Sequence, residues 1–270
     1  MANPQREHRT PADWPFFLAL SVLGGAYILL IAAMLTADAS YTSPFRIWQA
    51  LGSPAIRYAI WLSLLSCSIT AILSVWTAVP LGYLLSRFDF PGRRLIDVLI
   101  DIPIVLPPLV VGLSLLILFQ TPPGRFVNSI VSVTYAIPSV ILAQFSVACA
   151  FAVRTMRGTF DQIPRRREQV AMTLGCSRGQ AFWRVTLPEA RRGVVAAFTL
   201  AWARSLGEFG PILVFSGATR FRTEVLSTTV FLELSVGNLE AAIAVSLLMV
   251  AAAVVVLVIV QVIGAEKVLA

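Results

Sequence analysis

Residues 161–188 read DQIPRRREQVAMTLGCSRGQAFWRVTLP, and they form the one sizeable polar stretch of a chain that is otherwise strongly apolar. Pro164 suits the first turn of a helix, and Gly175 is placed to end that helix as a left-handed cap. The stretch therefore predicts a short amphipathic helix of about three turns. Its apolar face is made by Val170, Ala171 and Leu174.

A second short helix is predicted directly after this glycine. Ser177 and Gln180 have the spacing of a capping box, in which each side chain hydrogen-bonds the backbone of the other residue. Pro188 then breaks the helix before the next apolar run. The segment therefore reads as two short helices joined at Gly175, lying on a membrane surface.

The rest of the chain is too apolar for a water-soluble domain. Hydrophobic residues make up 57% of the 270 residues and charged residues only 13%, whereas soluble chains carry about 25% charged residues. One helical span needs roughly 20 apolar residues, so the chain holds several spans but no large domain outside the membrane. The predicted fold class is an all-α polytopic membrane protein.

Six transmembrane helices are predicted, with a polar N-terminal tail over 1–13 and a single transmembrane domain over 14–270. The first run is longer than the apolar part of a secretory signal, so we expect an uncleaved anchor. The polar segment 161–188 falls between the fourth and fifth runs. The apolar runs lie at about 14–37, 58–82, 96–119, 136–155, 194–216 and 240–263.

The distribution of Lys and Arg predicts the orientation. The two tails and the loops on the same side hold 15 of these residues, and the opposite loops hold five. Because positive loops stay in the cytoplasm, we expect both termini there and the protein in the cell (inner) membrane. The net charge of +7 follows from this asymmetry. Aromatic and basic residues do not alternate outside the membrane, so no nucleic-acid partner is expected.

Scarce residue types exclude several kinds of site. Lys267 is the only lysine, so a phosphate-binding loop of the form G-x-x-x-x-G-K-[ST] is excluded, and no cofactor is expected in this chain. His8 is the only histidine, which excludes paired-histidine metal sites and a Ser/His/Asp triad. The three cysteines are far apart, which is typical of small core residues. They are Cys67, Cys149 and Cys176.

The pattern Glu168-Gln-Val-Ala-x-x-x-Gly175, followed by Leu187-Pro188, resembles the EAA loop of membrane subunits of binding-protein-dependent ABC importers. Gln169 and Val170 depart from its commonest form without changing the helix-glycine-helix shape. The resemblance implies that the loop docks into a separate ATPase, which binds ATP and magnesium. The residues expected to couple the chain to that ATPase are Glu168, Val170, Ala171, Leu174, Gly175, Leu187 and Pro188.

The fifth run carries charges at membrane depth. Arg204 and Glu208 are four residues apart on one helical face, so they can pair and reduce each other's desolvation cost. The pair either fixes helix packing near a subunit interface or lines and gates the pathway. Gly207, Gly210 and Pro211 loosen the same helix, which favours a position inside the bundle.

Two segments narrow the resemblance to permeases for molybdate, tungstate and sulfate. One runs from Arg204 to Gly210, and the other from Asp101 to Gly112. Prolines in the second segment free backbone carbonyls, so this helix either lines the pathway or is an ordinary kinked span. Asp101 is interpreted as a charge near the interface, held by Arg93 or Arg94. The pathway or gate residues expected are Arg204, Ser205, Gly207, Glu208, Gly210, Pro103, Pro107 and Pro108.

Other partners follow from the resemblance. It implies two ATPase subunits, a second copy of the permease or a similar chain, and an extracytoplasmic binding protein that selects the ion. The loop 217–239 is either a docking surface for that protein or an ordinary solvated loop. No single span holds a dense set of oxyanion donors, because the polar residues are scattered. They are Ser114, Gln144, Ser146 and Ser205.

Three rival functions are weighed against this hypothesis. The first is an importer of another small solute, such as phosphate, ferric iron or thiamine. Only the motif in the fifth run distinguishes it from an oxyanion importer. A membrane-embedded hydrolase needs a nucleophile and a base at membrane depth, where the chain has no histidine or lysine. A proton-driven carrier is usually built from internal repeats and carries several acids within the membrane.

Overall fold

The computed structural model describes residues 13–266, and these residues form helices and connecting loops without any strand. The helices are, in chain order, α1 (Asp13–Tyr41), α2 (Pro44–Gly52), α3 (Pro54–Arg87), α4 (Arg93–Val105), α5 (Pro108–Gln120), α6 (Pro122–Ile130), α7 (Ile137–Gln162), α8 (Arg165–Thr173), α9 (Arg178–Ala181), η1 (Phe182–Thr186), α10 (Leu187–Glu189), α11 (Arg191–Leu206), η2 (Ile212–Ser216), α12 (Leu226–Ser235) and α13 (Leu239–Glu266).

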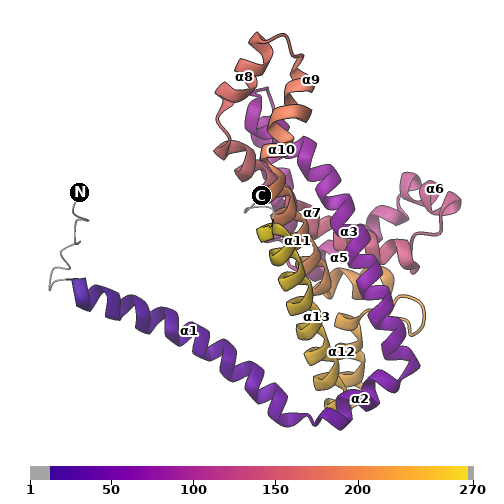
Figure 1. The fold of residues 1–270 in the computed structure, drawn as a ribbon. Coiled ribbons are helices and arrows are strands. Elements are labelled where there is room, and N and C mark those ends of the chain that lie inside the picture. Colours follow the sequence, from indigo (N-terminus) through magenta and orange to yellow (C-terminus); the bar gives the residue numbers. More distant parts are fainter. Residues whose placement is uncertain (1–12, 267–270) are drawn as a thin grey trace.

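The centre of the bundle is formed by α3, α7 and α11, which pack side by side (Figure 1). Buried small residues line their contacts, because in a membrane helices associate through close backbone packing rather than hydrophobic force. The fully buried Met156 and Phe160 fill the wider space between them. The small residues are Ala59, Cys67, Ala71 and Ala78 in α3, Ala148 and Ala152 in α7, and Ala197 and Ala201 in α11.

Four helices are long and apolar enough to cross a membrane: α1, α3, α7 and α13. The pair α4 and α5 is a fifth candidate, although the two helices are bent by 114° at their junction. The predicted all-helical class is therefore confirmed, together with several apolar spans. The number six stays a prediction.

The run predicted at 96–119 is broken where a kinked helix was expected. The backbone is extended at Leu106, with φ −65° and ψ 140°, and also at Pro107, with ψ 134°. A proline disfavours helical geometry at the residue before it. Two consecutive prolines therefore force both residues out of the helix, and α5 starts afresh at Pro108.

The run predicted at 194–216 is also divided. Its first part, α11, has 16 residues, fewer than the roughly 20 that one span needs. Gly207 ends this helix, and the chain continues through Pro211 into the π-helical turn η2. We expected Gly207 and Gly210 to loosen one helix, but in the structure they lie between two helices, α11 and η2.

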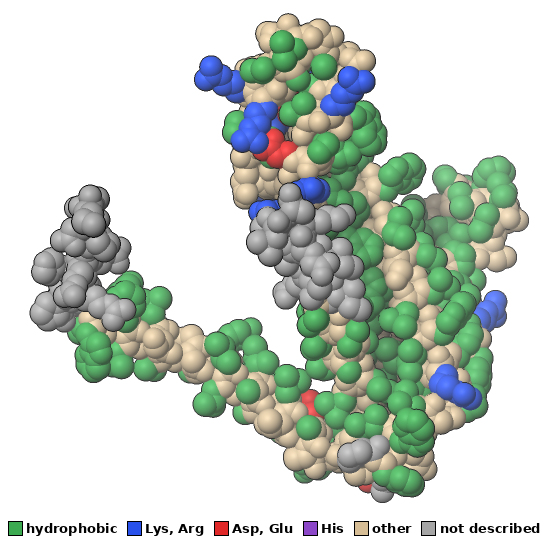
Figure 2. Space-filling view, viewed as in Figure 1, with side chains coloured by type: hydrophobic (Ala, Val, Ile, Leu, Met, Phe, Trp, Pro, Cys, Tyr) green, Lys and Arg blue, Asp and Glu red, His purple; other side chains and the backbone are tan. Residues whose placement is uncertain are grey.

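One end of the bundle carries α8, α9 and α10 (Figure 1). Figure 2 shows basic side chains gathered at this end, while hydrophobic side chains cover much of the rest of the visible face. Helix α1 extends away from the body, and none of its most apolar part is buried (Figure 1).

Candidate functional site

The glycine cap in the polar segment has the predicted geometry. Gly175 has φ +92°, in the left-handed region that glycine adopts at little cost. The amide of Gly175 donates to Met172 O at 3.0 Å, and the amide of Cys176 donates to Ala171 O at 3.1 Å. These bonds satisfy carbonyls at the end of α8 and fix the turn toward α9.

The capping box is also confirmed, and the break predicted at Pro188 lies two residues later, at Ala190 between α10 and α11. The Gln180 amide donates to the Ser177 hydroxyl at 3.3 Å, and the Ser177 amide donates to the Gln180 side chain at 2.8 Å. Pro188 lies in the first turn of α10, directly after the π-helical turn η1. A π-turn shifts the hydrogen-bond register, so the helix continues through a residue that lacks an amide hydrogen.

Glu168 points into the bundle. One carboxylate oxygen accepts from Nε of Arg87 at 2.8 Å, and the other accepts from the Tyr83 hydroxyl at 3.0 Å. Both partners lie in the last turns of α3. Neither partner was predicted, because nothing in the sequence pairs residues that are 81 and 85 positions apart.

Further bonds fasten the same segment to the end of α3. Arg87 also donates through Nη2 to Ile163 O at 2.9 Å, and Arg165 donates to Ser86 O at 2.6 Å. The Ser86 hydroxyl donates to Asp161 at 2.6 Å. These bonds come from both sides of Pro164, so they hold the start of α8 against the end of α3.

The three apolar residues expected on one face of α8 do not have the same exposure in the structure. Val170 is 49% exposed and Leu174 is 81% exposed, whereas Ala171 is 9% exposed and packs inward. A partner could therefore contact Val170 and Leu174, but not Ala171. Leu187 is half-buried beside an apolar groove, and Pro188 is exposed.

The two broken runs meet backbone to backbone. A Cβ built on Gly112 in α5 would lie 2.7 Å from Cα of Pro211. A Cβ on Gly210 would lie 2.9 Å from both Cβ of Pro108 and N of Leu109. Such approaches exclude any side chain at the two glycines. Of the predicted residues, Pro108 and Gly210 thus come together. Pro107 directly precedes Pro108, and Pro103 lies in the preceding helix α4.

The predicted ion pair lies beside this junction. Nη1 of Arg204 is 2.6 Å from a carboxylate oxygen of Glu208, and the Arg204 guanidinium lies 5.7 Å from the ring centre of Phe151. The Glu208 side chain is 1% exposed and that of Arg204 is 30% exposed. Helix α11 ends at Leu206, so the pair spans a helix end and not one continuous face.

Two predicted residues beside this pair act through the backbone. The Ser205 hydroxyl is buried and donates to Ala201 O at 2.8 Å, so it is not offered to a ligand. Gly207 caps α11. On the far side of the break, the Ser227 hydroxyl donates to Glu208 O at 2.7 Å and thereby connects α12 to the pair.

Gln144 connects the three central helices at the level of the break. It is 1% exposed. Its amide nitrogen donates to Ser205 O at 3.2 Å, and its oxygen accepts from the Thr70 hydroxyl at 3.2 Å. From the sequence, Gln144 was expected only to be one of several scattered polar residues. Its position at membrane depth was the available signal, since buried amides need partners.

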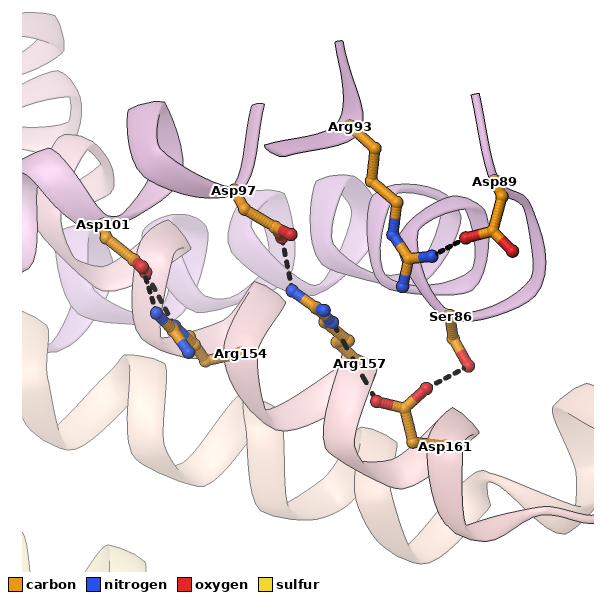
Figure 3. A network of polar contacts seen from close by, with 8 residues as sticks. All are labelled: Ser86, Asp89, Arg93, Asp97, Asp101, Arg154, Arg157 and Asp161. Atoms are coloured by element: carbon orange, nitrogen blue, oxygen red, sulfur yellow. Dashed lines mark hydrogen bonds and ion pairs between the residues drawn. The ribbon is translucent and has the colours of Figure 1, made fainter. Parts of the chain in front are cut away.

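The expectation for Asp101 is wrong, because its partner is Arg154 of α7 (Figure 3). Nε of Arg154 donates to Asp101 at 2.6 Å, and Nη2 donates to the second oxygen. One turn earlier in α4, Asp97 pairs with Arg157. Arg93 pairs instead with Asp89, which lies on its own segment. The α4 helix therefore turns its acidic face toward α7.

The loop before α12 holds a buried carboxyl. Glu224 is 1% exposed. Burial raises the pKa of this carboxyl above its ordinary value, and the Thr229 hydroxyl and the nearby Arg220 act in the opposite direction. Arg220 itself pairs with Glu233 at 2.7 Å.

The chain is similar to known transport proteins over most of its length. Residues 78–267 match the family described as the binding-protein-dependent transport system inner membrane component. The sulfate transport system permease protein CysT of Salmonella typhimurium is 32% identical, over 87% of this chain and 86% of that one. The molybdenum transport system permease protein ModB of Mycobacterium tuberculosis is 35% identical, over 90% and 92%.

Two further comparisons agree with these. The molybdate/tungstate transport system permease protein WtpB of Thermococcus kodakarensis is 35% identical, over 73% of this chain and 76% of that one. A chain from the crystal structure of a bacterial alginate ABC transporter, in complex with an alginate pentasaccharide-bound periplasmic protein, has the same fold. Its TM-score is 0.76 at 16% identity, and the match covers 95% of this chain and 96% of that one.

Proposed function

Because the chain belongs to the family of binding-protein-dependent transport system inner membrane components, we propose that it forms the passage of an ATP-driven importer for a small oxyanion. Relatives that share at least 30% of their residues with this chain are permeases for sulfate, molybdenum and molybdate/tungstate. These permeases are transport components, and ATP hydrolysis belongs to a separate subunit. The proposed cargo is molybdate, tungstate or sulfate.

The contact between the two broken runs supports this function most strongly. Gly112 of α5 lies against Pro211, and Gly210 lies against Leu109. In a membrane, irregular backbone is tolerated only where protein buries it or where it lines a water-filled cavity. We infer that this junction, with the Arg204–Glu208 pair beside it, lines the passage.

The charges of the pair suit an anion. Arg204 is the more exposed partner, and Glu208 is almost fully buried behind it. A passing dianion would meet the guanidinium first, while the carboxylate keeps the site close to neutral. Sites in a passage must bind well enough for entry and weakly enough for release.

The polar segment 161–188 is proposed to dock on the ATPase at the cytoplasmic face. Val170 and Leu174 offer exposed apolar side chains, and Gly175 sets the angle between the two short helices. Closure of the ATPase dimer would displace α8. Since Glu168 is fixed to α3, the displacement would reach the spans and drive alternating access.

The remaining architecture follows the same proposal. Six spans place both termini in the cytoplasm, with α4 and α5 as the third span and α11 and η2 as the fifth. A single bundle is too small to enclose a passage, so a second copy or a similar chain completes it. The opposite surface, around Arg220 and Glu233 before and within α12, would receive the binding protein.

Reconstitution tests the proposal directly. The chain, its ATPase and its binding protein are placed in liposomes, and uptake of molybdate, tungstate and sulfate is measured with and without ATP. We expect ATP-dependent uptake of at least one of the three, and its loss in Arg204→Gln/Glu208→Gln, which removes both charges. Arg125→Gln, at an exposed position in α6, is the matched control. Uptake without ATP, or of phosphate, ferric iron or thiamine alone, would contradict the proposal.

A further inference from the structure

Three arginines follow one another along one face of the bundle. Arg204 lies over the ring of Phe151 in α7. Arg154 comes three residues after Phe151, and Arg157 three residues after Arg154, so each is a helical neighbour of the one before it, while the row turns around α7 by about 60° at each step. A rise of 1.5 Å per residue places them about 4 and 9 Å further toward the end of α7.

Each of these three arginines forms an ion pair with a carboxylate. The carboxylate lies in another helix or, for Arg204, just after the end of the arginine's own helix. Arg154 and Arg157 pair with two aspartates of α4, as Figure 3 shows. Asp161 lies 3.9 Å from Nε of Arg157 as well, so four carboxylates accompany the three guanidinium groups that follow one another in the row. The pairs are Arg204 with Glu208, Arg154 with Asp101, and Arg157 with Asp97.

Exposure distinguishes the two partners of the first two pairs. The Arg204 side chain is 30% exposed against 1% for Glu208. The Arg154 side chain is 54% exposed against 28% for Asp101. In both pairs the arginine lies in front and the acid behind. An ion pair that served only to hold α4 against α7 would not need this arrangement.

Arg154 also keeps donors free. It uses Nε and Nη2 for the two oxygens of Asp101, and within residues 13–266 its Nη1 group makes no hydrogen bond. A planar guanidinium with unused N–H groups matches the oxygens of a tetrahedral anion.

We propose that Arg154 is a second contact for the oxyanion, reached after Arg204 on the way to the cytoplasmic side. This inference rests on the proposed function. Asp101 gives the site its weak affinity, because a paired guanidinium attracts a dianion less than a free one. Arg157, paired with Asp97, continues the row toward the end of α7.

Single substitutions in the pair separate this role from a purely structural one. Arg154→Gln leaves Asp101 unpaired, so the anion is repelled. Asp101→Asn leaves Arg154 free, so the anion is held more tightly and released more slowly. If the pair were only a clamp between α4 and α7, both substitutions would break it and have the same effect.

The test uses the complete complex in liposomes with saturating loaded binding protein. Uptake of tungstate and of sulfate gives the maximal rate, and tungstate retained by the washed complex gives the bound fraction. We expect Arg154→Gln to lower the rate about tenfold, the loss of one charge-assisted hydrogen bond, and to lower retention. Asp101→Asn should lower the rate but raise retention. Arg154→Lys, which keeps the charge without the planar fork, should fall between Arg154→Gln and the wild type.

Arg125→Gln is the matched control, because it removes the same kind of side chain at an exposed position in α6, outside the row. Equal retention in Arg154→Gln and Asp101→Asn would overturn the inference and leave a clamp. A wild-type complex that takes up no oxyanion would refute the proposed function itself. The two failures are therefore distinguishable.

Discussion

The carboxylate of Glu168 lies 2.8 Å from Nε of Arg87, and the two side chains are 10% and 6% exposed. This buried pair joins the segment proposed to dock on the ATPase to the end of a central helix. Breaking a buried pair by removing one partner is costly, because the other charge stays buried without compensation. The pair therefore connects the two segments mechanically, and loss of either partner should destabilise the protein.

Arg87→Gln should destabilise the protein strongly. We expect a loss of about 3 kcal/mol, the usual cost of leaving one partner of a buried pair unpaired, seen as a lower thermal unfolding temperature in detergent. Arg167→Gln is the control, because the Arg167–Glu189 pair is more exposed and should contribute under about 1 kcal/mol. Equal unfolding temperatures for the two variants would contradict a structural role of the Glu168 pair.

Substitution of Gly175 should uncouple transport without unfolding the chain. A Cβ at this position meets no atom within 4 Å, so the constraint is the backbone φ of +92° and not space. Gly175→Val should lose uptake while the liposome-bound ATPase continues to hydrolyse ATP. Gly175→Asn should remain closer to the wild type, because asparagine tolerates the left-handed region. Normal uptake by Gly175→Val would rule out the coupling role.

Gln144→Leu should lower stability by about 1–3 kcal/mol, because Ser205 O and the Thr70 hydroxyl lose a buried partner. Thermal unfolding in detergent measures this loss. Gln120→Leu, at an exposed position that ends α5, is the matched control and should change little. If both variants unfold at the wild-type temperature, Gln144 does not stabilise the position where α11 ends.

Glu224 predicts a pH dependence of stability. Its pKa is raised in the folded protein, so folding is favoured while the carboxyl is protonated. This contribution is complete below the unfolded pKa of about 4.3, and it is lost as the pH rises through the higher folded pKa. Glu224→Gln, which stays neutral, should therefore unfold at a higher temperature than the wild type at pH 8, and the difference should shrink toward pH 4.5. The Gln120→Leu variant, which removes no titratable group, is the control, and its difference from the wild type should be the same at both pH values.

The sequence predicted the local features of this protein better than its long-range contacts. The glycine cap at Gly175 and the capping box of Ser177 and Gln180 depend on neighbouring residues, and both have the predicted geometry. The partners of Glu168 and Asp101 lie far away in the chain, and no spacing rule identifies them. The break at Pro107 was underestimated, because a single-helix description assumes that hydrogen bonds can bridge a proline pair.

The glycine contacts between α5 and the segment before η2 have a consequence for how the passage opens. With backbone against backbone at Gly112 and at Gly210, neither segment can rotate alone without a collision. The two must travel as one rigid block. A transport cycle built on such a block has two end positions and few stable positions between them, which limits leakage of ions while the passage changes sides.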